Sequence, residues 1–200
     1  MRKVYDKAYF DRWYRTGLSR VQSAASLARK VRLAIGVAEY HLGRPIRSVL
    51  DVGCGEGAWL RPLRALRPDV CYLGLDSSDY AIARYGQSRN LRLCRFSDLA
   101  VQRFEGTVDL LVCSDMMHYV PTAELVQGLS GFAELCHGVA FLEVFCKGDR
   151  FHGDTDGFIA RTAAWYRKAF ARAGFLHCGN HCYLGPERHI WATALELATR

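Results

Sequence analysis

The sequence predicts an α/β fold in which helices cover both faces of a doubly wound, seven-stranded sheet, preceded by two N-terminal helices. Apolar runs of strand length alternate with segments of helical periodicity, which is typical of a mostly parallel sheet. The first of these runs ends in a cluster of glycines. The last two are joined by too few residues for a helical crossover, so we expect them to form an antiparallel C-terminal hairpin.

Length and composition favour a single globular domain. The chain has 200 residues, of which 50% are hydrophobic and 24% charged, which is ordinary for a globular protein. No apolar stretch approaches the roughly 18–20 residues of a membrane helix, and the N-terminus has no apolar signal core. We therefore expect one domain over residues 1–200, with a helical cap (1–45) and a core (46–200), no membrane association and a cytoplasmic location.

Two helices are expected before the first strand. Asp6 can cap a segment that ends at Gly17, and residues 19–22 fit a capping box. Beyond it, apolar residues recur every three or four positions and predict a helix that ends at Gly43. The residues of this stripe are Val21, Ala24, Ala28, Val31, Ile35, Ala38 and Leu42.

The remaining elements follow in alternation. Strands are predicted at 46–52, 70–75, 91–96, 108–113, 139–145, 175–184 and 189–197. Helices are predicted at 58–66, 79–85, 122–136 and 162–173. Pro121 suits the first turn of the third of these helices, and Gly174 ends the fourth.

The turn after the first strand carries three alternate glycines, Gly53, Gly55 and Gly57. Glycine permits a tight turn and lets backbone N–H groups approach a ligand closely. Acids end the next two predicted strands, at Asp76 and Asp98. Asp76 follows Gly57 by nineteen residues, a spacing at which a second-strand acid can bind two ribose hydroxyls. A dinucleotide-binding enzyme explains Asp76 but offers no role for Asp98.

The segment VLDVGCGEG, with these acids and the later DLLVCSDMMHYV stretch, resembles the class I S-adenosylmethionine-dependent methyltransferases, whose fold is Rossmann-like. The resemblance implies that the three glycines line the methionine moiety above Asp51, that Asp76 holds the ribose and that Asp98 accepts the adenine amino group. S-adenosylmethionine would be the cofactor and S-adenosylhomocysteine the product. The implied cofactor-binding residues are Asp51, Gly53, Cys54, Gly55, Gly57, Asp76, Ser77, Ser97, Asp98, Leu99, Ser114 and Asp115.

The segment from Ser114 to Tyr119 lacks the Asn/Asp-Pro-Pro-aromatic motif of enzymes that methylate base amines. His118 is the candidate catalytic base, since a protonated nucleophile must lose its proton before transfer. The alternative is a histidine that packs against the cofactor or caps the next helix. His152, in the polar loop after the fifth strand, is a second candidate for the acceptor site.

Aromatic residues crowd the N-terminal segment, including Tyr9 and Trp13. In the methyltransferases that this sequence resembles, such helices often cover the site, so we expect both residues, with Tyr119 and His152, to contact the acceptor. The alternative is that the cluster only packs the helix onto the domain.

Charge and cysteines bear on possible partners. Residues 1–50 hold eleven Lys/Arg against three Asp/Glu, within a chain of net charge +7. A small-molecule hydroxyl, amine or carboxylate is the expected acceptor. One alternative is an RNA methyltransferase, because a basic, aromatic arm suits nucleic-acid binding. The other is a non-catalytic, cofactor-binding partner subunit.

We expect a monomer or homodimer and no metal site. In an extended segment, the two His and two Cys of residues 177–182 would lie on opposite faces and could not converge on one ion.

Overall fold

The computed structural model of the protein describes residues 3–15 and 21–198. Its seven strands form one sheet in the order β3-β2-β1-β4-β5-β7-β6. The strands are β1 (Ser48–Val52), β2 (Cys71–Asp76), β3 (Leu91–Leu93), β4 (Val108–Ser114), β5 (Cys136–Glu143), β6 (Leu176–Gly179) and β7 (Cys182–Leu184). The first five are parallel, whereas β7 is antiparallel to both β5 and β6. The predicted fold class is confirmed.

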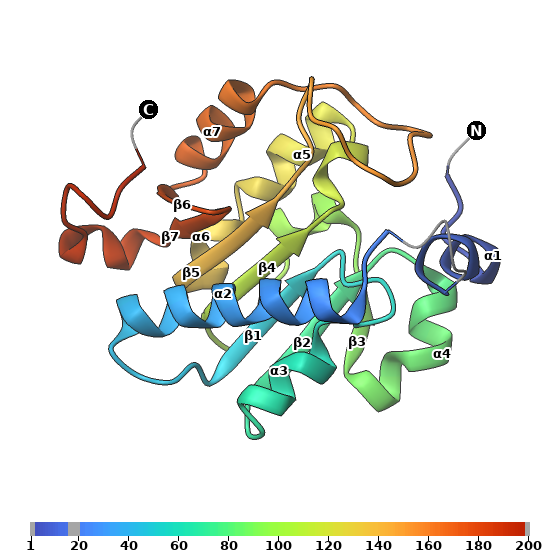
Figure 1. Cartoon of the computed structure of the whole chain (residues 1–200), viewed down its shortest axis with the longest axis horizontal. Coiled ribbons are helices and arrows are strands. Elements are labelled where there is room, and N and C mark those ends of the chain that lie inside the picture. The colour runs from blue at the N-terminus through green and yellow to red at the C-terminus, as the bar shows by residue number, and fades with distance from the viewer. Residues whose placement is uncertain (1–2, 16–20, 199–200) are drawn as a thin grey trace.

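Helices or 3₁₀ turns connect the first six strands, and a short turn joins β6 to β7 (Figure 1). The α-helices are α1 (Lys7–Phe10), α2 (Ala24–Leu42), α3 (Leu60–Leu66), α4 (Asp79–Arg89), α5 (Thr122–Leu129), α6 (Phe132–Leu135) and α7 (Ala163–Arg172). A π-helical turn (Asp11–Arg15) extends α1, and 3₁₀ turns cover Phe96–Ala100, Met117–Tyr119 and Pro186–Trp191. Within the described residues, no helix is long and apolar enough to span a membrane.

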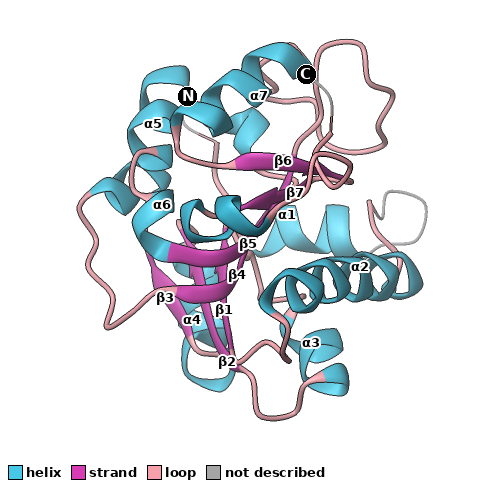
Figure 2. Ribbon diagram, turned by 90° about the vertical axis from the view of Figure 1, so that its left-hand side faces the viewer, coloured by secondary structure: helices cyan, strands magenta, loops and turns pink. Residues whose placement is uncertain are grey.

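Buried side chains of β4 alternate between the two faces of the sheet. Leu110 and Val112 belong to one apolar cluster with residues of α2 and α3, whereas Leu111 and Cys113 belong to a second cluster with residues of α5, α6 and α7. Figure 2 shows the two groups of helices on opposite sides of the sheet. A parallel sheet buried on both faces explains why its strands read as continuous apolar runs.

Helix α2 ends where the sequence predicts but begins later. Gly43 closes it in the left-handed conformation (φ 66°) and donates its N–H to the Glu39 carbonyl. Ser23 caps its N-terminus by accepting a hydrogen bond from the Ser26 N–H. The predicted capping box begins at Ser19, which lies outside the described residues; its described members Val21 and Gln22 precede the helix, because Ser23 supplies the cap.

The predicted helix over 122–136 is interrupted. It divides into α5 and α6 between Leu129 and Phe132. A Cβ on Gly131 would lie 2.3 Å from the Leu99 carbonyl oxygen, so this glycine lets the backbone of the Phe96–Ala100 turn approach closely. Cys136, predicted as helical, instead begins β5.

The C-terminal hairpin is present, but its strands are both drawn from residues 176–184. Asn180 and His181 have φ values of 49° and 64°, which form the two-residue turn favoured between antiparallel strands. The predicted strand over 189–197 was wrong: Pro186 starts a 3₁₀ turn, and Ile190 in it is 81% exposed.

The carboxyl ends of β1, β2 and β4 lie at one edge of the sheet, because these strands are parallel neighbours. In doubly wound sheets, ligands bind at this edge where the strand order reverses. Here the chain passes from β1 outward to β2 and β3 and then returns to β4 on the other side of β1. The fold thus places the glycine turn and the acids beyond it together.

Candidate active site

The turn after β1 is built on left-handed glycines. Gly53, Gly55 and Gly57 have φ values of 72°, 55° and 74°, which other residues adopt only with strain. The N–H of Gly53 donates to the Leu75 carbonyl of β2 at 2.7 Å. A Cβ on Gly53 would lie 2.5 Å from Cγ of Met116. The glycines therefore set both the turn and its close approach to the segment after β4.

Asp76 ends β2 directly beside this turn. Its carboxylate accepts the Gly55 N–H at 2.7 Å and the Ser78 N–H at 2.8 Å. Burial raises the pKa of this carboxyl, and the backbone N–H groups oppose that shift. Ser77, next along the chain, is exposed. The predicted pair of glycine turn and acid is thus in direct contact.

Asp51 lies beneath the turn, away from solvent. It is 2% exposed and accepts a hydrogen bond from the Tyr72 hydroxyl at 2.7 Å. Burial raises its pKa to about 7, and the charge of Asp76 adds to the shift. Cys54 is also buried. Both residues support the turn from within the core.

Ser97, Asp98 and Leu99 lie in the 3₁₀ turn that follows β3, which is parallel to β2. Leu99 is buried in the core at 1% exposure, whereas the other two are partly exposed. The Cys94 N–H donates to the Asp76 carbonyl, which ties the start of this segment to the end of β2. The structure therefore places Asp98 at the same edge of the sheet as Asp51 and Asp76.

A cluster of polar side chains lies at the end of β4, and only two of them, Ser114 and Asp115, were predicted from the sequence. The Ser114 hydroxyl donates to Glu143 Oε2 at 2.5 Å, and Lys30 Nζ lies 2.5 Å from the same oxygen. Asp115 follows with a φ of 60° and donates its N–H to the Glu143 carbonyl. Burial raises the Asp115 pKa to about 7, helped by the charge of Glu143. Lys30 and Glu143 were missed. Glu143 could have been found, because it is an acid that ends an apolar strand, like Asp76.

His118 lies behind Asp115 and has no exposed surface. Its Nδ1 is 3.4 Å from the Phe145 N–H, and its Nε2, without a hydrogen-bond partner among the described residues, is 3.6 Å from Asp115 Oδ1. Rings of Tyr119, Phe145 and Phe158 surround it, with centroids 4.2–5.6 Å away. Burial lowers its pKa to about 4, so the ring is neutral at physiological pH.

A third residue missed from the sequence, Arg161, fixes the segment that contains His118. It is 6% exposed and donates to the Val120 carbonyl at 2.6 Å and to the Thr122 hydroxyl at 2.9 Å. It also lies within hydrogen-bonding distance of the Met117 carbonyl and the Tyr166 hydroxyl. This buried cation holds the chain between β4 and α5 in place.

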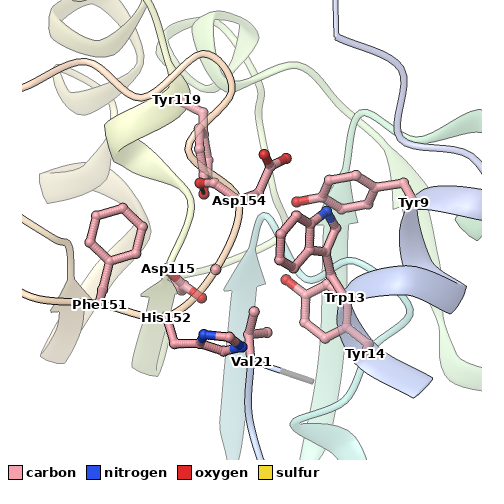
Figure 3. Close-up of a pocket in the computed structure, with 10 residues that line it drawn as sticks. Tyr9, Trp13, Tyr14, Val21, Asp115, Tyr119, Phe151, His152 and Asp154 are labelled. Atoms are coloured by element: carbon pink, nitrogen blue, oxygen red, sulfur yellow. Dashed lines mark hydrogen bonds between the residues drawn. The ribbon is translucent and has the colours of Figure 1, made fainter. Parts of the chain in front are cut away.

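A pocket lies between the N-terminal segment, the end of β4 and the loop after β5 (Figure 3). We call it the aromatic pocket; it is lined by Tyr9, Trp13, Tyr14, Val21, Asp115, Tyr119, Phe151, His152, Gly153 and Asp154. Its free space is about 10 Å³, room for about one water molecule. The four predicted acceptor residues, Tyr9, Trp13, Tyr119 and His152, all line it, whereas His118 does not.

The N-terminal arm, residues 3–15, also packs on the glycine turn. A Cβ on Gly55 would lie 3.1 Å from Cε1 of Phe10, which is 5% exposed. The Phe10 ring stacks on Tyr80 of α4 at 5.9 Å. The Ser78 hydroxyl donates to the Tyr5 carbonyl at 2.5 Å. The arm therefore contacts both the turn and the residues next to Asp76.

The His and Cys residues of 177–182 do not form a metal site. His177 stacks on Tyr183, and Cys182, the first residue of β7, is buried in the core. No group of three or more His, Cys, Asp or Glu side chains suited to a metal ion occurs within residues 3–15 and 21–198.

Comparison with known proteins agrees with this geometry. Residues 50–138 match the family described as "Methyltransferase domain". A trans-aconitate 2-methyltransferase of Deinococcus radiodurans is 35% identical over 78 residues, which are 39% of this chain and 30% of that protein. The matched part thus spans less than a third of the relative's length.

Solved structures share the fold. The magnesium protoporphyrin IX methyltransferase of Synechocystis PCC 6803, with bound S-adenosylhomocysteine, superposes with a TM-score of 0.57 at 21% identity, covering 86% of each chain. DesVI of Streptomyces venezuelae gives a TM-score of 0.62 at 16% identity, covering 80% of this chain and 92% of that one. Residues 50–138 are thus similar to a methyltransferase domain, and the chain shares the Rossmann-like fold of these solved methyltransferases.

Proposed function

We propose that the protein transfers a methyl group from S-adenosylmethionine to a small molecule with a hydroxyl, amine or carboxylate acceptor. The observation that carries this proposal is the contact between the Asp76 carboxylate and the Gly55 N–H, at the edge of the sheet where the aromatic pocket also lies. The cofactor, when bound, supplies a methyl group on a sulfonium sulfur.

The residues at this edge suit such a cofactor. Gly53, Gly55 and Gly57 adopt the left-handed conformation that the turn requires, and the space in front of Gly55 would open to a ligand once Phe10 moves. Asp76, held by two backbone N–H groups, would accept hydrogen bonds from the ribose hydroxyls. Asp98 would accept a hydrogen bond from the adenine amino group. Ser77, Ser97 and Leu99 flank these acids and would complete the cofactor site.

At the acceptor side, we assign the contacts to Tyr9, Trp13, Tyr119 and His152. Asp115, at the end of β4, lines the same pocket and offers a carboxylate to the acceptor. His118 lies behind it and would act on the acceptor only through Asp115. Transfer from a sulfonium needs alignment above all, and the packed aromatic walls would exclude water while the acceptor is held.

We also propose that residues 1–45 form a cap over the site. Phe10 occupies the space in front of Gly55, so entry of a ligand at the glycine turn requires this side chain to move. Replacing Phe10 with Ala should therefore speed association of S-adenosylhomocysteine, measured by stopped-flow fluorescence. An unchanged rate would leave the arm a purely structural element.

Small-molecule acceptors are supported by the similar proteins, which are named for trans-aconitate and magnesium protoporphyrin IX. The basic composition of the N-terminal arm is weak support for RNA as the acceptor, because several of its cations are already paired. In the structure Lys3, Lys7 and Arg15 each lie in an ion pair with an acid of the chain. The same is true of Lys30.

The test is methyl transfer itself. The protein would be incubated with methyl-labelled S-adenosylmethionine and a panel of small amines, alcohols, carboxylates and bulk RNA, and labelled products detected by mass spectrometry. We expect label in a small molecule and its loss in Asp76→Ala. Label in RNA alone would show that the acceptor is RNA and not a small molecule. Binding of the cofactor without any transfer would favour a non-catalytic partner subunit.

A further inference from the structure

The ammonium group of Lys3 is held in a cage of aromatic rings and one carboxylate. Its Nζ lies 4.0 Å from the centroid of the Tyr119 ring, 5.4 Å from that of Tyr9 and 5.7 Å from that of Tyr5. The Asp154 carboxylate is 2.5 Å away, and the Asp156 carbonyl accepts a hydrogen bond at 2.8 Å. We call Tyr5, Tyr9, Tyr119 and Asp154 the cation cage.

Contacts among the residues of the cation cage hold them in place. The Tyr119 hydroxyl donates to the Asp154 carbonyl at 2.5 Å, which fixes ring and carboxylate relative to each other. Tyr5 and Tyr9 meet edge to face, with centroids 5.0 Å apart. The side chain of Asp154 is 11% exposed and that of Lys3 is 16% exposed. Shielding from water strengthens both ion pairing and the attraction of a cation to aromatic faces.

This cage adjoins the aromatic pocket and shares residues with it. Tyr9, Tyr119 and Asp154 belong to both. Asp115 adds a second carboxylate to the pocket, whereas the nearby Lys30 is already paired with Glu143. The only full cation at the cage among the described residues is therefore the one that the chain's own arm supplies.

We propose, on the basis of the proposed methyltransferase function, that the acceptor is an amine that binds as an ammonium ion and takes the place of Lys3 in the cation cage. Aromatic faces and a carboxylate recognise a positive charge through its field and need no particular shape of ligand. Among the described residues that line the pocket, an anionic acceptor would meet two carboxylates, Asp115 and Asp154, and no Lys or Arg. The proposal thus selects the amine among the three acceptor classes.

An ammonium ion has no lone pair and must lose a proton before it can react. Asp115 accepts this proton: the N–H bond breaks, an O–H bond forms on the carboxylate, and the electron pair stays on nitrogen. That pair forms the new N–C bond with the methyl carbon, whose bond to sulfur breaks with its electrons remaining on sulfur. Charge and atoms balance, with no further reactant.

Three matched probes test the proposal by binding alone. With the full-length protein at saturating S-adenosylhomocysteine, 2-phenylethylamine, 2-phenylethanol and 3-phenylpropionate would be titrated by calorimetry. We expect the amine to bind at least about ten-fold more tightly than the other two. Equal affinities, absence of binding by all three, or preference for the carboxylate would overturn the proposal.

Substitutions at the cation cage sharpen the test. Lys3→Met removes the internal competitor and should tighten binding of the amine several-fold without affecting the alcohol. Lys7→Met is the matched control, because this exposed lysine pairs with Asp11 outside the cage. Asp154→Asn should weaken binding of the amine. Unchanged amine affinity in Lys3→Met, in protein shown to be folded by circular dichroism, would contradict the assignment.

Failure of this inference and failure of the proposed function are distinguishable. Binding of S-adenosylhomocysteine is measured first on the same protein. If it binds and the amine shows no preference, only the acceptor class is wrong. If it does not bind, the probes are titrated without it, and a preference for the amine would leave the cation cage standing without the methyltransferase function.

Discussion

The Asp76 carboxylate and the Gly55 backbone N–H are joined by a 2.7 Å hydrogen bond across the carboxyl ends of β2 and β1. The two residues are 21 positions apart in the chain, yet the parallel pairing of β1 with β2 brings them together. This bond connects an acid suited to ribose hydroxyls with the turn suited to close ligand approach.

Replacing Asp76 with Ala should weaken binding of S-adenosylhomocysteine by about 1–3 kcal/mol, because charge-assisted hydrogen bonds to the ligand are lost. Calorimetric titration measures the change. Asp79→Ala is the control, since Asp79 is exposed at the start of α4, three residues away. Equal losses in the two variants would show that the effect is not specific to the site.

Two glycine substitutions should have opposite effects on stability. Gly55→Ala places a Cβ in a left-handed conformation and 3.1 Å from Phe10, so the free energy of unfolding should fall by about 1 kcal/mol or more. Gly36→Ala should raise it by roughly 0.5–1 kcal/mol, because Gly36 lies exposed inside α2 with nothing within 4 Å of a new Cβ. Denaturant titration checks both, and a stabilised Gly55→Ala would contradict the account of the turn.

His118 should make the fold sensitive to acid. Its pKa of about 4 lies below the unfolded value of about 6.5, so the unfolded chain binds more protons between these values. The stability that the neutral ring contributes is present above pH 6.5 and is lost as the pH falls toward 4, on the order of 3 kcal/mol in all.

The measurement is the difference in unfolding free energy between the wild type and His118→Asn across this range. Asp51 and Asp115, whose pKa values are raised to about 7, act in the opposite direction in both proteins, so only the difference isolates the histidine. We expect the difference to shrink as the pH falls. A constant difference would mean that the ring titrates normally in the fold.

Replacing Arg161 with Met should destabilise the protein by about 2–4 kcal/mol, because buried carbonyls between β4 and α5 lose a charged donor. Arg32→Met, on the exposed side of α2, is the control and should be nearly neutral. Thermal unfolding of the two variants distinguishes them. Similar melting temperatures would mean that Arg161 does not hold the segment.

The sheet was predictable because its strands are buried on both faces and therefore appear as apolar runs between helices. The C-terminal strands were placed wrongly because an Asn-His turn carries no glycine at its centre, so the run over 175–184 read as one strand. The start of α2 was placed wrongly because two serines, Ser19 and Ser23, each precede the helix and only contacts decide which one caps it.

The glycine turn was visible in the sequence, since its left-handed backbone favours glycine, and the acids were visible because they follow apolar runs of strand length. The polar partners were not, because they come from distant segments. Lys30 pairs with Glu143 across 113 positions, and Lys3 reaches Asp154 from the other end of the chain. Such contacts follow from how helices and loops pack over the sheet, which periodicity does not specify.

The central claim is that the glycine turn and Asp76 bind S-adenosylmethionine, and calorimetric titration of the purified protein tests it most directly. We expect S-adenosylmethionine and S-adenosylhomocysteine to bind with one site per chain, NADH not to bind, and Asp76→Ala to weaken both positive titrations. Binding of NADH with no binding of either sulfur compound, on protein shown to be folded, would contradict the claim.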